Sequence, residues 1–395
     1  MKKHFLRSLF AIGVLTSCSS TSEDAYVDIV DTYPAVEATF GSSIDLNSLE
    51  NYANQSIPAY ITKNNGTANP ITDKGATLGR VLFYDKKLSS NNTISCSSCH
   101  KQEIAFGDNS VASTGVNGST GRHSMRLINT RFATESKFFW DERAASLEIQ
   151  TTMPIKDHGE MGYSGTNGDA TFADLIVKMN EIDYYKELFK FVYGSSEITE
   201  GKIQLALGQF IRSIQSFDSK YDAGRATAQN DGMPFANFTA QENMGKNLFL
   251  APPAFNASGV RTGGGIGCAG CHRAPEFDIA PNSGNNGIIG KISGAGIDIT
   301  NTRAPSLRDL VGPTGTLNGQ MMHTGVITSL QAAIGHYGTI NIAPGNTNLD
   351  PRLRPGGNGQ QLNLNANEVN AVIAFLETLS GTAVYTNPKW SDPFN

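Results

Sequence analysis

The chain lacks several features that would indicate common classes of protein. Its net charge is −5 over 395 residues and it has no tract of lysines or arginines, which argues against nucleic-acid binding. Convincing strand-like alternation of apolar and polar residues is scarce, which argues against an all-β fold. Cysteine is scarce as well: there are five, and four of them fall into two short motifs, so no pair is left over for a structural disulfide.

The start of the chain predicts export. The basic residues of MKKHFLR precede an apolar run over 9–15 that is too short to span a bilayer, a pattern typical of a secretory signal. The signal ends in Leu-Thr-Ser-Cys, which resembles a bacterial lipobox. We therefore expect a lipoprotein signal peptide over 1–17, a lipid on Cys18 as the only link to a membrane, a polar tether over 18–68 and a periplasmic location. The alternative is an ordinary cleaved signal with an incidental cysteine.

The other four cysteines lie in two copies of the motif C-x-x-C-H. The copies are Cys96, Cys99 and His100, and Cys268, Cys271 and His272. In this motif both thiols can bond to the vinyl groups of a haem, and the adjacent histidine ligates the iron. We therefore expect two covalently bound c-type haems, with His100 and His272 as the proximal ligands.

Two other uses of such cysteines fit less well. Zinc-binding pairs usually recur within a few tens of residues, whereas Cys96 and Cys268 are 172 residues apart. A redox-active dithiol would be expected in a thioredoxin-like βαβ setting, which the sequence does not indicate.

Helical signals dominate the rest of the chain, and one of them is repeated. LGRVLFYDKKL (78–88) precedes the first motif and MGKNLFLAPPA (244–254) precedes the second, with Gly-Arg/Lys-x-Leu-Phe in both. A helix, a loop and C-x-x-C-H therefore occur twice. We predict a mostly α fold with long connecting loops and two cytochrome c-like domains, over 69–230 and 231–395, each with one covalent haem.

Longer segments resemble a known family. They are GRVLFYDKKLSSNNTISCSSCH (79–100), FFWDERAASLEIQTTMPIKDHGEMG (138–162), RAPSLRDL (303–310), MMHTG (321–325) and LQAAIGHYG (330–338). Their residues and order resemble the bacterial di-haem cytochrome c peroxidases and the related MauG proteins. The resemblance implies that the N-terminal haem binds peroxide and that the C-terminal haem passes in electrons. It also allows for one calcium ion between the domains and for a homodimer, without assigning residues to either.

The resemblance implies roles for three further residues. Gln150 and Glu160 match the distal catalytic pair of the family, and Trp140 matches the tryptophan between its haems. Peroxide cleavage needs a group that moves a proton between the two oxygens and a group that orients the O–O bond; a carboxylate and an amide suit these tasks. Taken without the resemblance, Glu160 would be a solvated loop carboxylate, Gln150 a helix-surface amide and Trp140 a core aromatic.

The sequence departs from the family at two ligand positions. Relatives of the peroxidase type carry a distal histidine on the loop after the first haem motif, but the loop 107–120 has none. Either His123 or Met125 ligates the first iron, or neither does and the site is open to peroxide; a loop histidine bonded to the backbone is a further reading of His123. At the second haem, Tyr337 stands where peroxidases often have methionine, which resembles MauG. Tyr337 is then either an iron ligand or a buried aromatic at a helix end.

These observations favour a cytochrome c peroxidase that reduces hydrogen peroxide with electrons from a small donor protein such as a cytochrome c. A first alternative is a MauG-like oxidase or maturase that acts on a protein or organic substrate. A second is a non-catalytic di-haem electron-transfer cytochrome, in which Gln150 and Glu160 would have no task.

Overall fold

The computed structural model describes residues 32–279 and 282–394. The predicted signal peptide, Cys18 and the first part of the predicted tether lie outside these residues. Within the described chain no helix is long and apolar enough to cross a membrane. Residues Tyr33–Asn395 form one compact unit.

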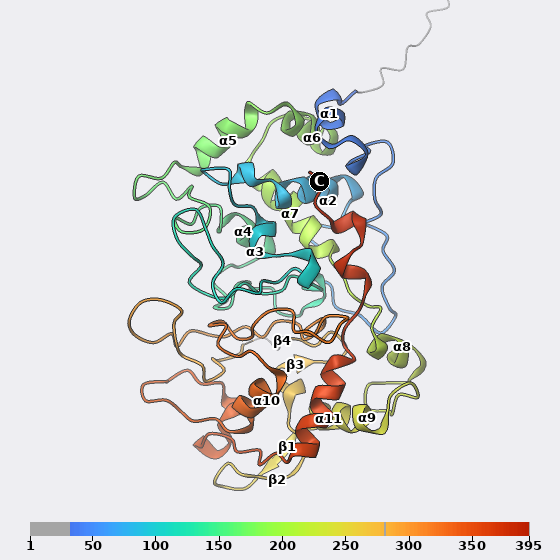
Figure 1. Cartoon of the computed structure of the whole chain (residues 1–395), viewed down its shortest axis with the longest axis vertical. Helices are drawn as coiled ribbons and strands as arrows, with labels where there is room; N and C mark the ends of the chain where they lie inside the picture. Colours follow the sequence, from blue (N-terminus) through green and yellow to red (C-terminus); the bar gives the residue numbers. More distant parts are fainter. Residues whose placement is uncertain (1–31, 280–281, 395) are drawn as a thin grey trace, which may run out of the picture. The chain divides into compact units, whose positions relative to one another are not determined.

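Helices make up most of the regular structure, as the sequence predicts, and long loops join them (Figure 1). In chain order they are α1 (Pro34–Phe40), α2 (Asp73–Tyr84), α3 (Cys96–Cys99), α4 (Leu147–Thr152), α5 (Phe172–Asn180), α6 (Asp183–Tyr193), α7 (Glu200–Ser213), α8 (Lys220–Thr227), α9 (Ala240–Leu250), α10 (Leu330–Gly338) and α11 (Ala366–Glu377). The described strands are short: β1 (Pro253–Phe255) pairs antiparallel with β2 (Arg261–Gly264), and β3 (His272–Arg273) pairs antiparallel with β4 (Asp278–Ile279).

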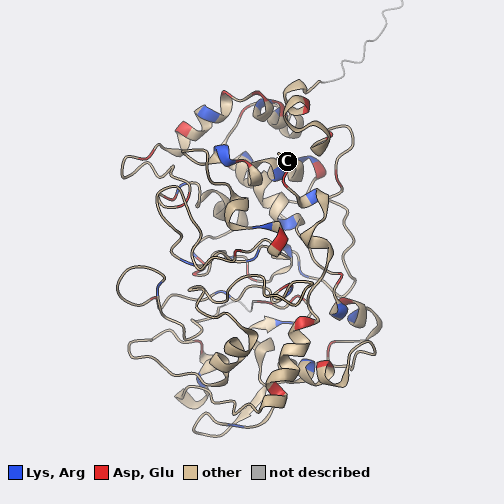
Figure 2. Cartoon of the chain, in the orientation of Figure 1, with Lys and Arg blue, Asp and Glu red and all other residues tan. Residues whose placement is uncertain are grey.

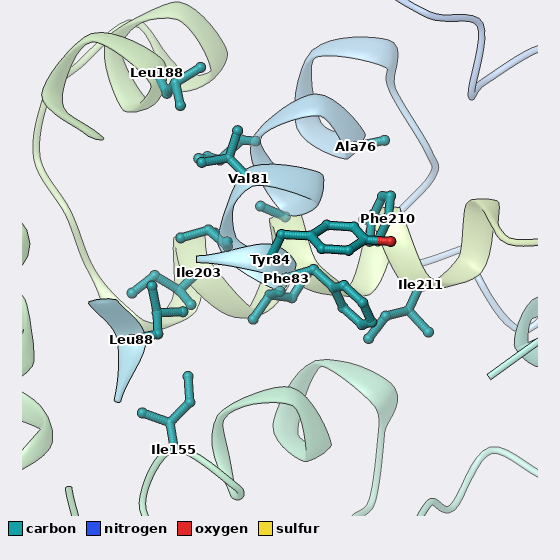
Figure 3. Packing of buried hydrophobic residues seen from close by; sticks show 14 of the residues in the cluster. Ala76, Val81, Phe83, Tyr84, Leu88, Ile155, Leu188, Ile203, Phe210 and Ile211 are labelled. Atoms are coloured by element: carbon teal, nitrogen blue, oxygen red, sulfur yellow. The ribbon is translucent and has the colours of Figure 1, made fainter. Parts of the chain in front are cut away.

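The repeated segment forms a helix in both halves of the chain, and each copy packs closely on a second helix. In the first half α2 packs on α7: a Cβ on Gly79 would lie 2.1 Å from the carbonyl oxygen of Ala206, so only glycine allows this approach. The ring of Phe83, four residues on, lies 5.2 Å from that of Phe210. Figure 3 shows Phe83 and Tyr84 of α2 beside this part of α7.

The second half repeats this helix pair with α9 and α11. A Cβ on Gly245 would lie 1.8 Å from the carbonyl oxygen of Ala371. The ring of Phe249 lies 5.2 Å from that of Phe375. The repeat seen in the sequence is therefore a repeat of one helix–helix contact, with glycine and phenylalanine in corresponding places.

The buried apolar side chains form two large clusters. The first is drawn from residues 36–214, and the second from residues 221–379. Val384 and Trp390, near the end of the chain, belong to the first cluster, and the indole Nε1 of Trp390 donates to Oγ of Ser213 at 3.2 Å. Apart from these two residues, the clusters separate between residues 214 and 221, and the domain boundaries at 68/69 and 230/231 stay predictions.

The described part of the predicted tether packs on the body. Residues 33–68 contain α1 and the buried Tyr52, whose hydroxyl donates to the carbonyl oxygen of Lys389 at 2.5 Å. Lys63 forms ion pairs with Glu276 at 2.9 Å and with Asp278 at 2.7 Å. Tyr52 also belongs to the first apolar cluster, where its ring lies 6.5 Å from that of Phe210, so the segment packs on both halves of the chain. A free tether could therefore include only residues that precede it.

Charged side chains of both signs are spread over the chain (Figure 2). Several of them begin helices: the capping boxes of Thr171 with Asp174, Thr239 with Glu242 and Asn365 with Glu368 are all formed. In such a box each side chain satisfies an amide of the first helical turn.

Candidate functional site

Two cavities lie beside the two C-x-x-C-H motifs. The first has a volume of about 420 Å³ and is lined by Cys96, Cys99 and His100. The second has a volume of about 580 Å³ and is lined by Cys268, Cys271 and His272. These volumes lie in the range of cofactor pockets. Each motif thus lies on the wall of a space that can hold a large planar group.

The first motif is held by a short capped helix. Ser95 and Ser98 form a capping box at the start of α3, which runs from Cys96 to Cys99. Nδ1 of His100 lies 3.2 Å from the carbonyl oxygen of Phe106, so the ring is oriented and Nε2 is the nitrogen left for a metal. Burial lowers the pKa of His100 to about 4, and the imidazole is therefore neutral, as a metal ligand must be.

The second motif lies on a single 3-10 turn, Cys268–Gly270, after Gly267 in the left-handed conformation. Burial also lowers the pKa of His272 to about 4. Its Nδ1 is buried and has no hydrogen-bond partner in the described residues. Both histidines are thus neutral and buried.

The residues present fit two covalently attached haems. All four cysteines are free thiols, and burial raises the pKa of Cys96 and Cys268 to about 12. Thiols that are protonated and unpaired are available for thioether bonds. Each pair is followed by a neutral buried histidine on the same cavity, which is the donor set of a c-type haem.

Gln150 and Glu160 line the same cavity as the first motif. Gln150 lies on α4, which is fixed to α7 by an ion pair between Glu148 and Arg212. The Nδ2 of Asn69 also donates to Glu148, at 2.9 Å. The structure therefore brings the two sequence-predicted catalytic residues to one site, as the resemblance implies, while their roles stay a proposal.

The backbone of Glu160 is held by the loop 107–120. The amide of Val116 donates to the carbonyl oxygen of Glu160 at 2.9 Å. Gly115 makes this approach possible, because a Cβ there would lie 2.0 Å from the carbonyl oxygen of Gly159 and 2.8 Å from Cα of Glu160. The loop that lacks a histidine thus serves to position Glu160.

The Glu160 side chain is half-buried rather than solvated. Burial, with a smaller contribution from the charge of Asp157, raises the pKa of Glu160 to about 7, and Arg143 opposes this rise. A carboxyl group with a pKa near neutrality can both take up and release a proton at physiological pH.

One wall is common to the two cavities. We call it the shared wall; it consists of His123, Ser124, Met125, Arg126, Trp140 and Arg303. Trp140 is 8% exposed, and its Nε1 donates to the carbonyl oxygen of His123 at 2.6 Å. The amide of Arg303 donates to the carbonyl oxygen of Trp140 at 2.7 Å. Trp140 is thus fixed between the two cavities, in agreement with the position that the resemblance implies.

The two candidate ligands of the first iron belong to the shared wall, and each contacts another residue. Nδ1 of His123 lies 2.8 Å from the carbonyl oxygen of Ser110, as expected for a loop histidine bonded to the backbone. Sδ of Met125 lies 3.7 Å from Nη1 of Arg303. The contact of His123 leaves its Nε2 unbound, as the contact of His100 does, so it fits an iron ligand as well as a loop histidine, and the sixth ligand stays a prediction.

Tyr337 lies at the end of α10 and lines the second cavity with Cys268, Cys271 and His272. Burial raises its pKa, so the phenol is protonated. Its hydroxyl lies 3.9 Å from Sδ of Met322, which also accepts from Nδ2 of Asn286 at 3.1 Å. The predicted ligand is on the correct cavity, and its bond to iron stays a prediction.

Sequence reasoning missed two arginines of the shared wall, Arg126 and Arg303. Arg303 lies in one of the segments that carry the resemblance, but no motif indicates a role for either residue. Their place in the structure shows that both arginines line the two cavities beside the C-x-x-C-H motifs. Among the described residues, no group of three or more His, Cys, Asp or Glu side chains is placed to hold a metal ion, and calcium stays a prediction.

Comparisons with known proteins agree with this arrangement. Residues 73–230 match the family model described as di-haem cytochrome c peroxidase. MauG, a methylamine utilization protein of Methylorubrum extorquens, is 29% identical over 334 residues, which is 82% of this chain and 83% of that protein. The cytochrome c551 peroxidase of Nitrosomonas europaea is 27% identical over 320 residues, 78% of this chain and 80% of that protein.

A crystal structure supports the same relationship. A MauG-like protein associated with microbial copper homeostasis superposes with a TM-score of 0.64 at 28% identity, covering 87% of this chain and 99% of that one. The two C-x-x-C-H motifs, their cavities and these relatives lead to one conclusion: residues 73–230 belong to the di-haem cytochrome c peroxidase family, and the chain as a whole is similar to its peroxidase and MauG members.

Proposed function

We propose that this protein is a peroxidase that reduces hydrogen peroxide to water with electrons from a small external donor protein such as a cytochrome c. The observation that carries the proposal is that Glu160, with a pKa of about 7, and Gln150 line the same cavity as Cys96, Cys99 and His100. The family implies two c-type haems, which when bound supply the iron that binds peroxide and the iron that accepts electrons. In this proposal, Cys96, Cys99 and His100 hold the first haem and the second motif holds the other.

The side chains of the first cavity manage protons and orientation. Glu160 in its carboxylate form takes the proton from one oxygen of peroxide and returns it to the other, so that the departing oxygen leaves as water. Gln150 offers an amide donor that orients the O–O bond. Each peroxide consumes two electrons and two protons and yields two waters, and the electrons come from the donor protein.

Trp140 has the position of a relay. Its ring lines both cavities and is fixed by two backbone hydrogen bonds, so an oxidisable side chain lies between the two haem sites. The second cavity, with His272 and Tyr337, then receives electrons from the donor. Two cytochrome c-like domains, over 69–230 and 231–395, and a periplasmic lipoprotein anchored at Cys18 complete the proposal.

A MauG-like oxidase is the second candidate. Tyr337 on the second cavity favours it, and so do relatives that carry the MauG name. In that case the electrons would come from the protein or organic substrate that is oxidised, and turnover would not need a separate electron-donor protein. The two candidates share the peroxide step at Glu160 and differ in the source of the electrons.

Peroxide turnover by the haem-loaded protein tests the proposal. A reduced small cytochrome c is supplied, and its oxidation is followed after peroxide is added to fully ferric and to half-reduced enzyme. Rapid donor oxidation in wild type that is lost in Glu160→Gln supports the peroxidase. Haem spectra that respond to peroxide without any donor oxidation, in either starting state, would replace it with the MauG-like oxidase.

A further inference from the structure

Two arginines of the shared wall have no carboxylate partner. Within residues 32–279 and 282–394, neither Arg126 nor Arg303 forms an ion pair, although the other deeply placed arginines do so, or bind several carbonyl and hydroxyl oxygens as Arg80 does. The Nε of each is buried and has no hydrogen-bond partner. Each guanidinium therefore has at least one N–H donor without an acceptor among the described residues.

The few contacts of these groups are weak. Nη2 of Arg126 donates to the carbonyl oxygen of Ser306 at 3.1 Å. Nη1 of Arg303 contacts the sulfur of Met125 at 3.7 Å, and its guanidinium lies 5.1 Å from the centre of the Phe138 ring. Neither set of contacts neutralises a positive charge.

Burial adds to the cost of these charges. It lowers the pKa of Arg126 to about 10 and lowers that of Arg303 as well. Carboxylates act on them only from a longer range: Asp309 on Arg126, and Glu135, Asp278 and Glu142 on Arg303. A buried charge without a partner costs several kcal/mol, so folds usually pair it.

Paired arginines elsewhere in the chain show what is missing. Arg308 is fully buried and binds both carboxylate oxygens of Asp222, at 2.8 and 2.9 Å. Arg261 binds Glu368 at 2.7 Å. Among the described residues the buried cations Arg80 and Lys246 also lack a carboxylate partner, but each side chain donates to two backbone carbonyl oxygens. The side chain of Arg126 donates to one such oxygen and that of Arg303 to none, so an anion that is not part of the chain is expected at the shared wall.

We propose that Arg126 and Arg303 bind the propionate carboxylates of the two haems. A haem carries its two propionates on the edge opposite the vinyl groups, and the thioether bonds hold the vinyl edge at the cysteines. A guanidinium binds a carboxylate through two parallel hydrogen bonds, which suits the unused donors of both residues. The inference rests on the two haem sites of the proposed function, and not on peroxide turnover.

The test uses the full-length holoprotein with its propionate carboxylates isotope-labelled. Redox-induced infrared difference spectra and the midpoint potentials are measured for Arg126→Gln and Arg303→Gln, for the corresponding lysine variants, and for Arg261→Gln as a control that lines neither cavity. Each glutamine variant is expected to shift labelled carboxylate bands and to lower the midpoint potential of at least one haem, because loss of the cation favours ferric iron. The control is expected to match wild type.

Labelled bands that stay unchanged in both haem-loaded glutamine variants would overturn the proposal, even where the potential falls, because the cations would then act only from a distance. If the glutamine variants fail to load haem, the lysine variants carry the test. Lysine keeps the charge but loses the fork of donors, so the bands must still shift. An enzyme inactive toward peroxide would leave all of these results intact.

Discussion

The two halves of the chain pair their helices in the same way but surround the paired helices with different side chains. Gly79 and Phe83 meet Ala206 and Phe210 in the first half, while Gly245 and Phe249 meet Ala371 and Phe375 in the second. A buried cation follows the glycine in both: Arg80 donates to the carbonyl oxygen of Ser391, and Lys246 donates to that of Met233. One scaffold has therefore been used twice.

The chemistry beside the scaffold differs. The first cavity has a carboxyl group with a pKa near neutrality and an amide, which suit proton transfer. The second has a phenol and a thioether, Tyr337 and Met322, which suit iron ligation and not proton transfer near pH 7. The two sites therefore share the packing of their helix pairs. They differ in the side chains that loops and helix ends place on the cavities.

The largest expected loss of activity comes from a substitution in the first cavity, and a matched substitution in the second cavity is expected to affect a different reaction step. Glu160→Gln keeps the shape of the side chain but cannot take a proton, so peroxide turnover is expected to fall by about 10²- to 10⁴-fold. Tyr337→Phe is expected to change the ferric spectrum of the second haem and the kcat/KM for the donor, with the rate of the peroxide step retained. Stopped-flow measurements with peroxide alone and with donor distinguish these steps. Equal losses in the peroxide step from both variants would contradict the division.

A smaller loss is expected from Gly115→Ala. The added carbon would lie 2.8 Å from Cα of Glu160, so the backbone at Glu160 must move. A displacement of about 1 Å at a catalytic group can cost about 10²-fold in rate. Gly121→Ala, in the same segment, is the control, because its Cβ would meet nothing within 4 Å. The rate of peroxide consumption is measured together with thermal unfolding, and a loss of stability without a loss of rate would argue against a positioning role.

The shared scaffold is tested by alanine at the two close-packed glycines. Gly79→Ala and Gly245→Ala each place a methyl group against a backbone carbonyl, and each is expected to destabilise the fold by about 1–3 kcal/mol. Gly201→Ala in α7 and Gly335→Ala in α10 are matched controls with nothing within 4 Å, and are expected to be stabilising by up to about 1 kcal/mol. Denaturant unfolding of the holoprotein measures all four. A large cost in only one half would show that the two helix pairs are not equivalent.

The smallest effect concerns pH. Because the pKa of Glu160 is about 7 and its carboxylate form is the base, turnover is expected to fall about tenfold per pH unit below neutrality and to level off above it. The charge of Asp157 contributes to the raised pKa of Glu160, so Asp157→Asn should lower that pKa and move the fall in activity to lower pH. A pH–rate profile for both proteins measures the shift. An unchanged profile would show that another group controls the proton transfer.

Short-range patterns in the sequence predicted much of this structure. The repeated segments before the two C-x-x-C-H motifs depend on neighbouring residues, and each contains a helix as predicted. Gln150, Glu160 and Trp140, which the resemblance singled out, line the cavities beside the motifs, and their roles stay a proposal. Arg126 could not be found in this way, because the sequence around an arginine in a loop does not indicate whether its side chain lines a cavity or lacks a carboxylate partner.

Contacts between residues far apart in the chain could not be predicted from the sequence. Residues 33–68 are polar enough to suggest a tether, yet buried groups such as Tyr52 and the ion pairs of Lys63 hold them to the body. Such contacts join residues that are far apart in the chain, and their energy depends on surfaces that form only after folding.

The place of Trp390 has a consequence for the order in which the molecule is completed. Trp390 and Val384 fill the apolar interior of the first half, and the hydroxyl of Tyr84 donates to the carbonyl oxygen of Trp390 at 2.6 Å. A ribosome makes these residues after all the others of this cluster, so the half that is synthesised first cannot close its interior until they have emerged. A chain terminated before residue 384 would therefore lose packing against α2, which is made some 300 residues earlier.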